Sequence, residues 1–389
     1  MTTITDIQTP IVYERLWDNR PKRIIEEHIE IIKDLNVDMI FRANWRFNPM
    51  PLNCFSIDES LYQICIDSGY SRDQQTQIIS EIKLNKPGII IIGAVPAQKI
   101  NKTEINELTG ETIPDTYYMA LDPAKWGITS PTKEELQSQM TKTVAAGGYF
   151  PDITNTDFQE LFFSWVQEQL MTGVTGIWID LLYTQAQIMY GYTQDMNHPA
   201  VIDSFNAATD IANHVHALGL FVGTWDSPSS NLAKNYGIIP QLDFVTGTPS
   251  VTEIQNMTMN IDSWTLRINN VREAFGDIPY FIFIDWAGPG SQTIAFSHLG
   301  DKQSLFLQTI NDFCNNNGLK FIFPVHGGNL APGWYDAKAQ GTYDAIKSII
   351  QGTELPQPQP QPEPSNKKLI VVGIIATSTL LYLWLREKK

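Results

Sequence analysis

The sequence predicts an α/β protein, a (β/α)8 TIM barrel followed by a single C-terminal transmembrane helix. Between residues 11 and 350, short apolar runs alternate with amphipathic stretches, which is typical of a parallel sheet with crossover helices. Eight such runs are present, the number that closes a barrel. One uncharged segment near the C-terminus reaches the length that spans a bilayer. These three observations define the predicted fold class.

The predicted strands are Ile11 to Trp17, Val37 to Phe41, Gly88 to Val95, Gly176 to Leu182, Leu220 to Asp226, Phe244 to Thr248, Tyr280 to Trp286 and Lys320 to Val325. Helical spacing of apolar residues fills several of the intervals, from Ile24 to Leu35 and from Ile202 to Val215. Gly219 and Gly318 stand where such helices should end. The last predicted helix runs from Tyr343 to Ile350 and completes the eighth strand-helix unit.

The stretch from Pro96 to Thr156 lacks strong periodicity and falls in the third strand-to-helix connection. Loops at this end of the strands build the active face of such barrels. We therefore expect this stretch to form a rim or lid over the site. No GxGxxG motif follows any strand, which argues against dinucleotide binding.

The two ends of the chain differ in character. The N-terminus is polar and lacks the apolar stretch of a secretory signal. Alternate prolines from Pro356 to Pro364 predict an extended spacer. An uncharged run from Leu369 to Leu385, flanked by lysines and an arginine, predicts an anchor in a lipid bilayer.

We therefore divide the chain into a barrel (1–353), a Pro/Gln-rich spacer (354–366) and a transmembrane anchor with basic flanks (367–389). The greater basic excess after the anchor favours a C-terminus in the cytoplasm and a barrel on the outer surface of a cell or virion. No signal that would export the barrel is present, so its side of the membrane stays open.

Composition excludes several classes of function. With 43% hydrophobic residues the chain can bury a large core, and its net charge of −15 disfavours a nucleic-acid partner. Three cysteines provide neither a disulfide framework nor a zinc site, although Cys54 and Cys65 could pair. The only HxH motif, His214-Val-His216, lies in a helical pattern that turns the two imidazoles apart. No metal and no cofactor are predicted.

Three aspartates end apolar runs: Asp180, Asp226 and Asp285. In this fold, residues at the carboxyl ends of the strands form the active site. Strand alternation places Trp178 and Asp180 on one face, and it likewise groups Phe283 with Asp285. We therefore expect Asp180 and Asp285 to point into the mouth of the barrel, above a layer of large side chains.

Paired carboxylates in a partly apolar mouth are what glycosidic bond cleavage requires, because one protonates the leaving oxygen and the other attacks the sugar or activates water. A separation of about 5 Å implies retention and one of roughly 6.5 to 9.5 Å inversion, so both outcomes stay open. The alternative for each aspartate is that it caps the next helix.

Other side chains at the same level suit a carbohydrate partner, since sugar C–H faces pack on aromatic rings. The candidates are Trp45, Tyr183, Trp225, Trp286 and Trp334. Arg42 and Asn44, after the second strand, could bind sugar hydroxyls or hold an aspartate ionised. His326, after the eighth strand, is a further candidate contact. Glu14 and Arg15 face opposite ways, so only one of them can face the lumen.

One region resembles a known family. The segments Tyr149-Phe-Pro-Asp-Ile-Thr-Asn-Thr-Asp-Phe, Phe163-Ser-Trp-Val and Gly173-Val-Thr-Gly-Ile-Trp-Ile-Asp180 resemble the approach to strand four of retaining alpha-glycosidase barrels, the alpha-glucosidase and alpha-galactosidase group. This resemblance implies that Asp180 is the nucleophile. The acid/base aspartate of that group follows a later strand, and the Trp225-Asp226 motif resembles it but falls one strand early. Asp285 is the competing candidate.

Two functions therefore stay open. One is hydrolysis of a polysaccharide or glycoconjugate at a membrane surface by a carboxylate pair. The other is a membrane-anchored carbohydrate-binding or structural surface protein that keeps the fold without turnover. An enzyme requires a second carboxylate within reach of Asp180 across an open cleft, whereas a scaffold allows Asp180 to be buried.

Overall fold

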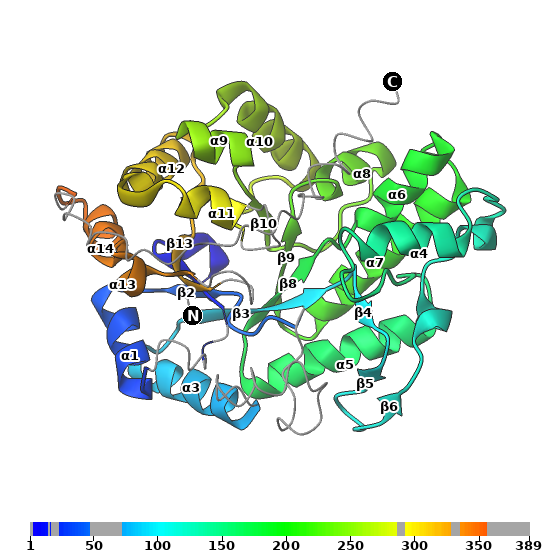
Figure 1. Cartoon of the computed structure of the whole chain (residues 1–389), viewed down its shortest axis with the longest axis horizontal. Helices are drawn as coiled ribbons and strands as arrows, with labels where there is room; N and C mark the ends of the chain where they lie inside the picture. Colours follow the sequence, from blue (N-terminus) through cyan, green and yellow to red (C-terminus); the bar gives the residue numbers. More distant parts are fainter. Residues whose placement is uncertain are drawn as a thin grey trace, which may run out of the picture.

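The eight predicted runs form the eight parallel strands of a barrel, in chain order around the ring (Figure 1). The computed structural model describes residues 3–14, 16, 23–46, 72–285, 292–327 and 335–355. The strands are β1 (Pro10–Tyr13), β2 (Met39–Phe41), β3 (Ile90–Pro96), β8 (Gly176–Asp180), β9 (Phe221–Trp225), β10 (Phe244–Gly247), β11 (Tyr280–Ile282), and β12 (Lys320–Phe321) with β13 (Phe323–Gly327). The predicted (β/α)8 barrel is confirmed.

The eighth strand closes the ring in two steps. Phe321 of β12 pairs with Ile282 of β11, and Phe323 of β13 pairs with Ile11 of β1. Between them, the backbone N–H of Ile322 donates to the carbonyl oxygen of Ile282 at 2.8 Å. One continuous run of chain thus bonds to both the seventh and the first strand, which closes the barrel. A short strand, β14 (Tyr335–Asp336), then pairs antiparallel with β13.

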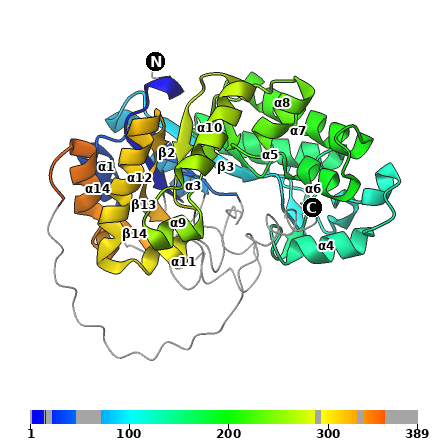
Figure 2. The ribbon, with the colours of Figure 1, turned by 90° about the horizontal axis from the view of Figure 1, so that it is seen from above.

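Helices follow each strand and surround the ring (Figures 1 and 2). They are α1 (Ile25–Asp34), α3 (Arg72–Asn85), α5 (Thr156–Thr172), α6 (Thr184–Thr193), α7 (Pro199–Ala217), α8 (Ser229–Tyr236), α9 (Val251–Asn256), α10 (Ile261–Phe275), α11 (Gln292–Ser297), α12 (Gln303–Asn317), α13 (Ala337–Gln340) and α14 (Tyr343–Gln351). The predicted helices near residues 24–35, 202–215 and 343–350 are confirmed. Gly318 ends α12 with a φ of 69°, a left-handed conformation that glycine adopts without strain.

The third connection, residues 97–155, has structure of its own. Strand β4 (Ile100–Asn101) pairs with β7 (Gly148–Tyr149), and β5 (Glu104–Ile105) pairs with β6 (Thr112–Ile113). Helix α4 (Lys133–Thr141) completes this insertion, which lies on the opposite side of the molecule from α14 (Figures 1 and 2). The insertion adjoins the carboxyl ends of the strands, because Ala97 N–H donates to the carbonyl oxygen of Asp180. Its action as a lid stays a prediction.

The insertion is fastened to the second strand through buried charges. Arg46, just after β2, lies 3.2 Å from Glu104 and 3.1 Å from Glu107 of the insertion. Its guanidinium also stacks on the ring of Trp165 in α5, 4.6 Å from the centroid. These contacts fix the insertion against the barrel wall beside the mouth.

None of the described helices is both long and apolar enough to span a bilayer. The predicted anchor, Leu369 to Leu385, and most of the proline-rich spacer lie outside the described residues, as do Cys54 and Cys65. The division of the chain at residue 353 therefore stays a prediction.

Candidate active site

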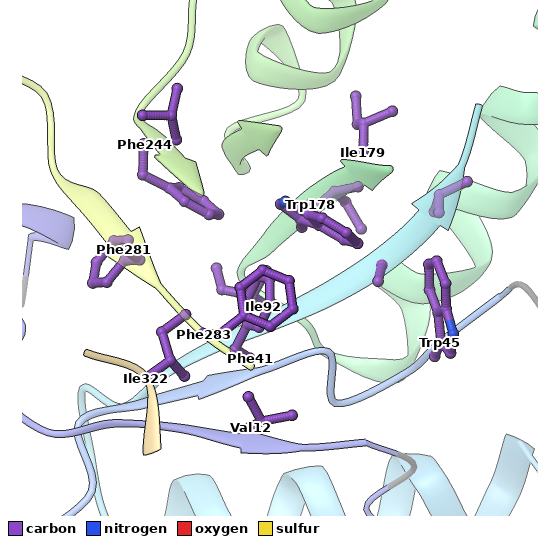
Figure 3. Close-up of a cluster of buried hydrophobic side chains, with 14 of the residues drawn as sticks. Val12, Phe41, Trp45, Ile92, Trp178, Ile179, Phe244, Phe281, Phe283 and Ile322 are labelled. Atoms are coloured by element: carbon purple, nitrogen blue, oxygen red, sulfur yellow. The ribbon is translucent and has the colours of Figure 1, made fainter. Parts of the chain in front are cut away.

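Large aromatic side chains fill the barrel lumen beneath the carboxyl ends of the strands. The ring of Trp178 lies at the centre of this layer, 5.4 Å from Phe41, 5.9 Å from Phe283 and 5.3 Å from Trp225. Figure 3 shows Trp178, Phe41 and Phe283 converging, with Ile179 directed away from them. Asp180 and Asp285 each follow one of these lumen residues by two positions, so both carboxylates lie one layer higher on the same face.

Asp180 is held by two donors. The indole Nε1 of Trp225 donates to its Oδ1 at 2.6 Å, and the Nε2 of Gln98 donates to its Oδ2 at 2.5 Å. Burial raises the pKa of Asp180 to about 6; the negative charge of Asp285 also raises it, while Trp225, Arg42 and Gln98 act in the opposite direction. Asp180 is therefore a carboxylate that titrates near neutral pH and interacts electrostatically with Asp285.

Arg42 joins two further carboxylates across the mouth. Its Nε lies 3.0 Å from Glu14 Oε1, and its Nη1 donates to Asp285 Oδ1 at 3.0 Å. Burial alone would lower the pKa of Arg42, but the charges of Glu14, Asp285 and Asp180 raise it, so the guanidinium stays charged. Its backbone adopts a left-handed φ of 61°, which is uncommon for a residue with a long side chain.

Glu14, Asp180 and Asp285 thus surround a single guanidinium. The side chain of Asp285 is 17% exposed and that of Glu14 is 4% exposed. Asp180 is also buried, with 8% of the whole residue exposed. The structure brings the predicted pair Asp180 and Asp285 together, with Arg42 beside them. A site of this charge attracts the positive charge that develops on a sugar ring during glycosidic cleavage.

The structure does not place Asp226, a predicted candidate for the acid/base, at the mouth of the barrel. Arg267 of α10 approaches both of its oxygens, with Nε at 2.7 Å and Nη2 at 3.1 Å, and the hydroxyl of Tyr280 donates at 2.5 Å. Because Trp225 faces the lumen, the next residue faces the surrounding helices. Asp226 therefore bonds β9 to α10 and does not share the mouth with Asp180.

Tyr183 and His326 are also placed differently from the prediction. Tyr183 is 1% exposed and packs on Phe205 of α7, since it lies at the start of α6 beneath the helix layer. His326 is fully buried, with Nδ1 3.1 Å from Asp336 and its ring 5.0 Å from Tyr13. Tyr13 bonds in turn to His28 of α1, so this group lies on the helix side of the wall. Neither residue lines a groove.

The predicted aromatic residues have mixed outcomes. Trp225 is partly exposed and bonds to Asp180, so it lies at the mouth. Trp45 is 5% exposed, and the guanidinium of Arg42 stacks on its ring at 4.4 Å from the centroid. Trp286 and Trp334 lie outside the described residues.

Two site residues were missed or left open. Glu14, one of the two residues between which strand alternation cannot choose, faces the lumen and contacts Arg42, whereas Arg15 lies outside the described residues. Gln98 is not among the residues that the sequence analysis predicts for the site, although it follows the end of β3 by two positions. The rule that selected the aspartates, a polar residue just beyond an apolar run, would have found it.

The sequence profile described as "Glycosyl hydrolases family 31 TIM-barrel domain" matches residues 44–317, more than half of the chain. The chain belongs to glycosyl hydrolase family 31. The resemblance to alpha-glycosidase barrels is confirmed, and the domain is that of a glycoside hydrolase. None of the curated proteins matches the sequence significantly.

Three solved structures are similar in fold to this family 31 chain at low sequence identity. Eubacterium rectale Amy13B shares 12% identity at a TM-score of 0.49, over 90% of this chain and 79% of that one. The glycoside hydrolase domain of PelA from Pseudomonas aeruginosa shares 9% at 0.43, over 81% and 93%. The isomaltulose synthase SmuA from Protaminobacter rubrum shares 11% at 0.46, over 89% and 70%.

This family 31 chain has no carboxylate directly after its sixth strand, β10, where the resemblance places the acid/base. Thr248 stands there and donates to Gln292, whose Oε1 also accepts the backbone N–H of Asp285 at 2.8 Å. The next carboxylate, Glu253, accepts the N–H of Ser250 and caps α9. Among the described residues, the aspartate that interacts electrostatically with Asp180 is Asp285, which follows β11.

Within the described ranges, no group of three or more His, Cys, Asp or Glu side chains is arranged to hold a metal ion. His214 and His216 lie on α7 as predicted, where His214 packs on Phe163 at 4.1 Å and His216 lies 3.5 Å from Asp243. Cys314 is buried in α12.

Proposed function

We propose that this protein cleaves O-glycosidic bonds, with Asp180 as the nucleophile and Asp285 as the second carboxylate. The observation that carries the proposal is the position of Asp180 at the end of the fourth strand of a family 31 barrel, held by Trp225 and Gln98 and coupled to Asp285. Asp180 is ionised above about pH 6 and can then attack the anomeric carbon.

The surroundings suit this chemistry. Trp225 and Gln98 fix both oxygens of Asp180, so that the carboxylate keeps one orientation toward the sugar. Arg42 holds Asp285 in place through an ion pair and also pairs with Glu14. Among the described residues of the mouth, it is the guanidinium that lies between these carboxylates. We assign the role of second carboxylate to Asp285, because its side chain is the more accessible of the two that Arg42 contacts.

The test is hydrolysis by the full-length protein of a panel of aryl glycosides, led by α-glucosides and α-galactosides, and of polysaccharides. Replacing the nucleophile in Asp180→Asn should lower the rate at least about 10³-fold. Asp210→Asn is the matched control, because Asp210 is exposed on α7 and none of the contacts of the mouth involves it. Equal rates for wild type and Asp180→Asn would refute the proposal.

The absence of a carboxylate directly after β10 favours a second candidate, carbohydrate binding without turnover. Under this candidate the same mouth holds a sugar, but no group donates a proton to the leaving oxygen. Calorimetric binding of a sugar to wild type, combined with no hydrolysis of any glycoside in the panel, would support it. Hydrolysis that requires Asp180 would exclude it.

We further propose that the protein acts at a membrane surface through the segment Leu369 to Leu385. The support is its uncharged sequence and basic flanks. Co-sedimentation with liposomes should fall to background when residues 365–389 are deleted. Sedimentation that is unchanged by the deletion would contradict the anchor.

A further inference from the structure

We infer that Gln98 recognises the hydroxyl group next to the reacting carbon of the bound sugar, the 2-hydroxyl. This inference rests on the proposed function, because it requires a sugar to bind over Asp180. It adds a specificity residue from the insertion that follows β3. The strands of the barrel supply the carboxylates, and the insertion would supply the contact that selects the ligand.

The first observation is an acceptor without a partner. Gln98 is 2% exposed, and its Nε2 donates to Asp180 Oδ2 at 2.5 Å. Its Oε1 is also buried and accepts no hydrogen bond from any described residue. Leaving a buried acceptor unpaired is unfavourable by about 1–3 kcal/mol, so such an atom beside a reactive carboxylate points to a ligand that supplies the donor.

The orientation of the Gln98 amide is fixed by chemistry. The ionised carboxylate of Asp180 can only accept hydrogen bonds, so the amide must turn its NH2 group toward Asp180. The reverse orientation would place two acceptor oxygens against each other. The carbonyl oxygen is therefore the part of Gln98 that remains for a ligand.

Distance selects the hydroxyl. The nitrogen and oxygen of one amide lie about 2.3 Å apart, which places Oε1 within about 5 Å of Asp180 Oδ2. A carbon attacked by Asp180 lies about 3–3.5 Å from the carboxylate oxygen. The hydroxyl on the adjacent ring carbon is the donor nearest to both atoms, and hydrogen bonds at this hydroxyl strengthen in the transition state.

Two other buried glutamines, Gln75 and Gln169, differ from Gln98 in the group to which they donate a hydrogen bond. Gln75 and Gln169 also have buried Oε1 atoms without a hydrogen bond, but each donates to a backbone carbonyl, Gln75 to Ala43 and Gln169 to Ala94. They secure the barrel wall. Gln98 alone among these three donates to a carboxylate of the mouth, which makes Gln169 a matched control.

The experiment measures binding of cationic iminosugars to the full-length protein by calorimetry, in gluco and galacto configurations, each with and without the 2-hydroxyl. Such analogues imitate the charge of the transition state. Wild type should bind the 2-hydroxy form about tenfold more tightly than the 2-deoxy form. Gln98→Met should bind both forms within about twofold, and Gln169→Met should keep the tenfold difference.

Equal affinity of wild type for both forms would overturn the role of Gln98 and leave the proposed function standing. A tenfold preference that persists in Gln98→Met would also overturn it. No binding of any analogue to wild type would overturn the inference together with sugar binding at this site. The ligand comparison in the wild type alone can still refute the inference even if Gln98→Met does not fold.

Discussion

Asp180 is the residue on which the proposed chemistry depends, and its surroundings act on its proton in opposite directions. Burial and Asp285 raise its pKa, whereas Trp225, Arg42 and Gln98 oppose that rise, and the balance brings the pKa to about 6. A fully exposed aspartate would be ionised at much lower pH. The carboxylate is therefore ionised at neutral pH and becomes protonated under mildly acidic conditions.

The role of Asp180 can be read from the pH dependence of the rate. As a nucleophile it must be ionised, so kcat/KM should fall as the pH decreases through about 6. If Asp180 were instead the general acid, the rate would fall as the pH rises through the same value. Initial rates from pH 4 to 9 with an aryl glycoside distinguish the two roles.

The same titration should appear in stability. Asp180 has a higher pKa in the folded protein, about 6, than its ordinary 3.8, so its contribution to stability is fully present below about pH 4 and is lost as the pH rises to about 6. Relative to Asp180→Asn, wild type should lose about 3 kcal/mol of unfolding free energy over this range. Urea unfolding of both proteins from pH 3.5 to 8 measures this loss of unfolding free energy. If the free energies of the two proteins changed in parallel with pH, the raised pKa of Asp180 would be contradicted.

At the scale of elements, the aspartates that follow β9 and β11, Asp226 and Asp285, have separate tasks. Asp226 bonds strand β9 to helix α10 through Arg267 and to the base of β11 through Tyr280. Arg267 also stacks on Trp264 of the same helix, 3.8 Å from the ring centroid. The strand-helix unit is thus held by a charge pair outside the lumen, while Asp285 turns inward to Arg42.

Substitutions of these residues should separate the structural task of Asp226 from the catalytic task proposed for Asp285. Asp226→Asn should lower the unfolding free energy by about 2–3 kcal/mol, because it leaves Arg267 without its charged partner, and Tyr280→Phe by about 1 kcal/mol. Neither should change kcat by more than about twofold. Asp285→Asn should lower kcat at least about 10²-fold with a smaller effect on stability. Denaturant unfolding and steady-state rates on the same preparations measure both, and a reversal of this pattern would reassign the second carboxylate to Asp226.

At the scale of the whole molecule, a buried polar group supports the closure of the barrel between its first and last strands. Arg23 donates two hydrogen bonds to Asp336, at 2.5 and 2.7 Å, and Asp336 also contacts His326 of β13. Arg23 reaches the hydroxyl of Tyr13 in β1 at 3.2 Å. The group links segments more than 300 residues apart in the chain.

Acid should weaken this closure. Burial alone would raise the pKa of Asp336, but the hydrogen bonds and charges of His326 and Arg23 lower it well below its usual range. The stability that Asp336 contributes is therefore present above about pH 4 and is lost as the pH falls below it. Asp336→Asn should lower the unfolding free energy by about 3 kcal/mol at pH 6, and the difference should shrink toward pH 3. A difference independent of pH would contradict the charge pairing.

Much of this architecture could be predicted from the sequence. The eight apolar runs gave the strands and their order, because a parallel strand buried on both faces needs an apolar run and each crossover needs a helix. The period of two along a strand places Asp180 on the face of Trp178, and Asp285 on the face of Phe283. These inferences depend on local periodicity alone.

The sequence by itself determined the barrel, the family and the two inward carboxylates. Only the tertiary structure decided that Asp226 pairs with Arg267, that Arg42 joins Glu14 to Asp285, and that Gln98 reaches Asp180. Alternation says that Trp225 and Asp226 face opposite ways, but the tertiary contacts decide that Trp225 is the one that faces the lumen. The partners of each charge come from segments far apart in the chain, and no local pattern encodes those contacts.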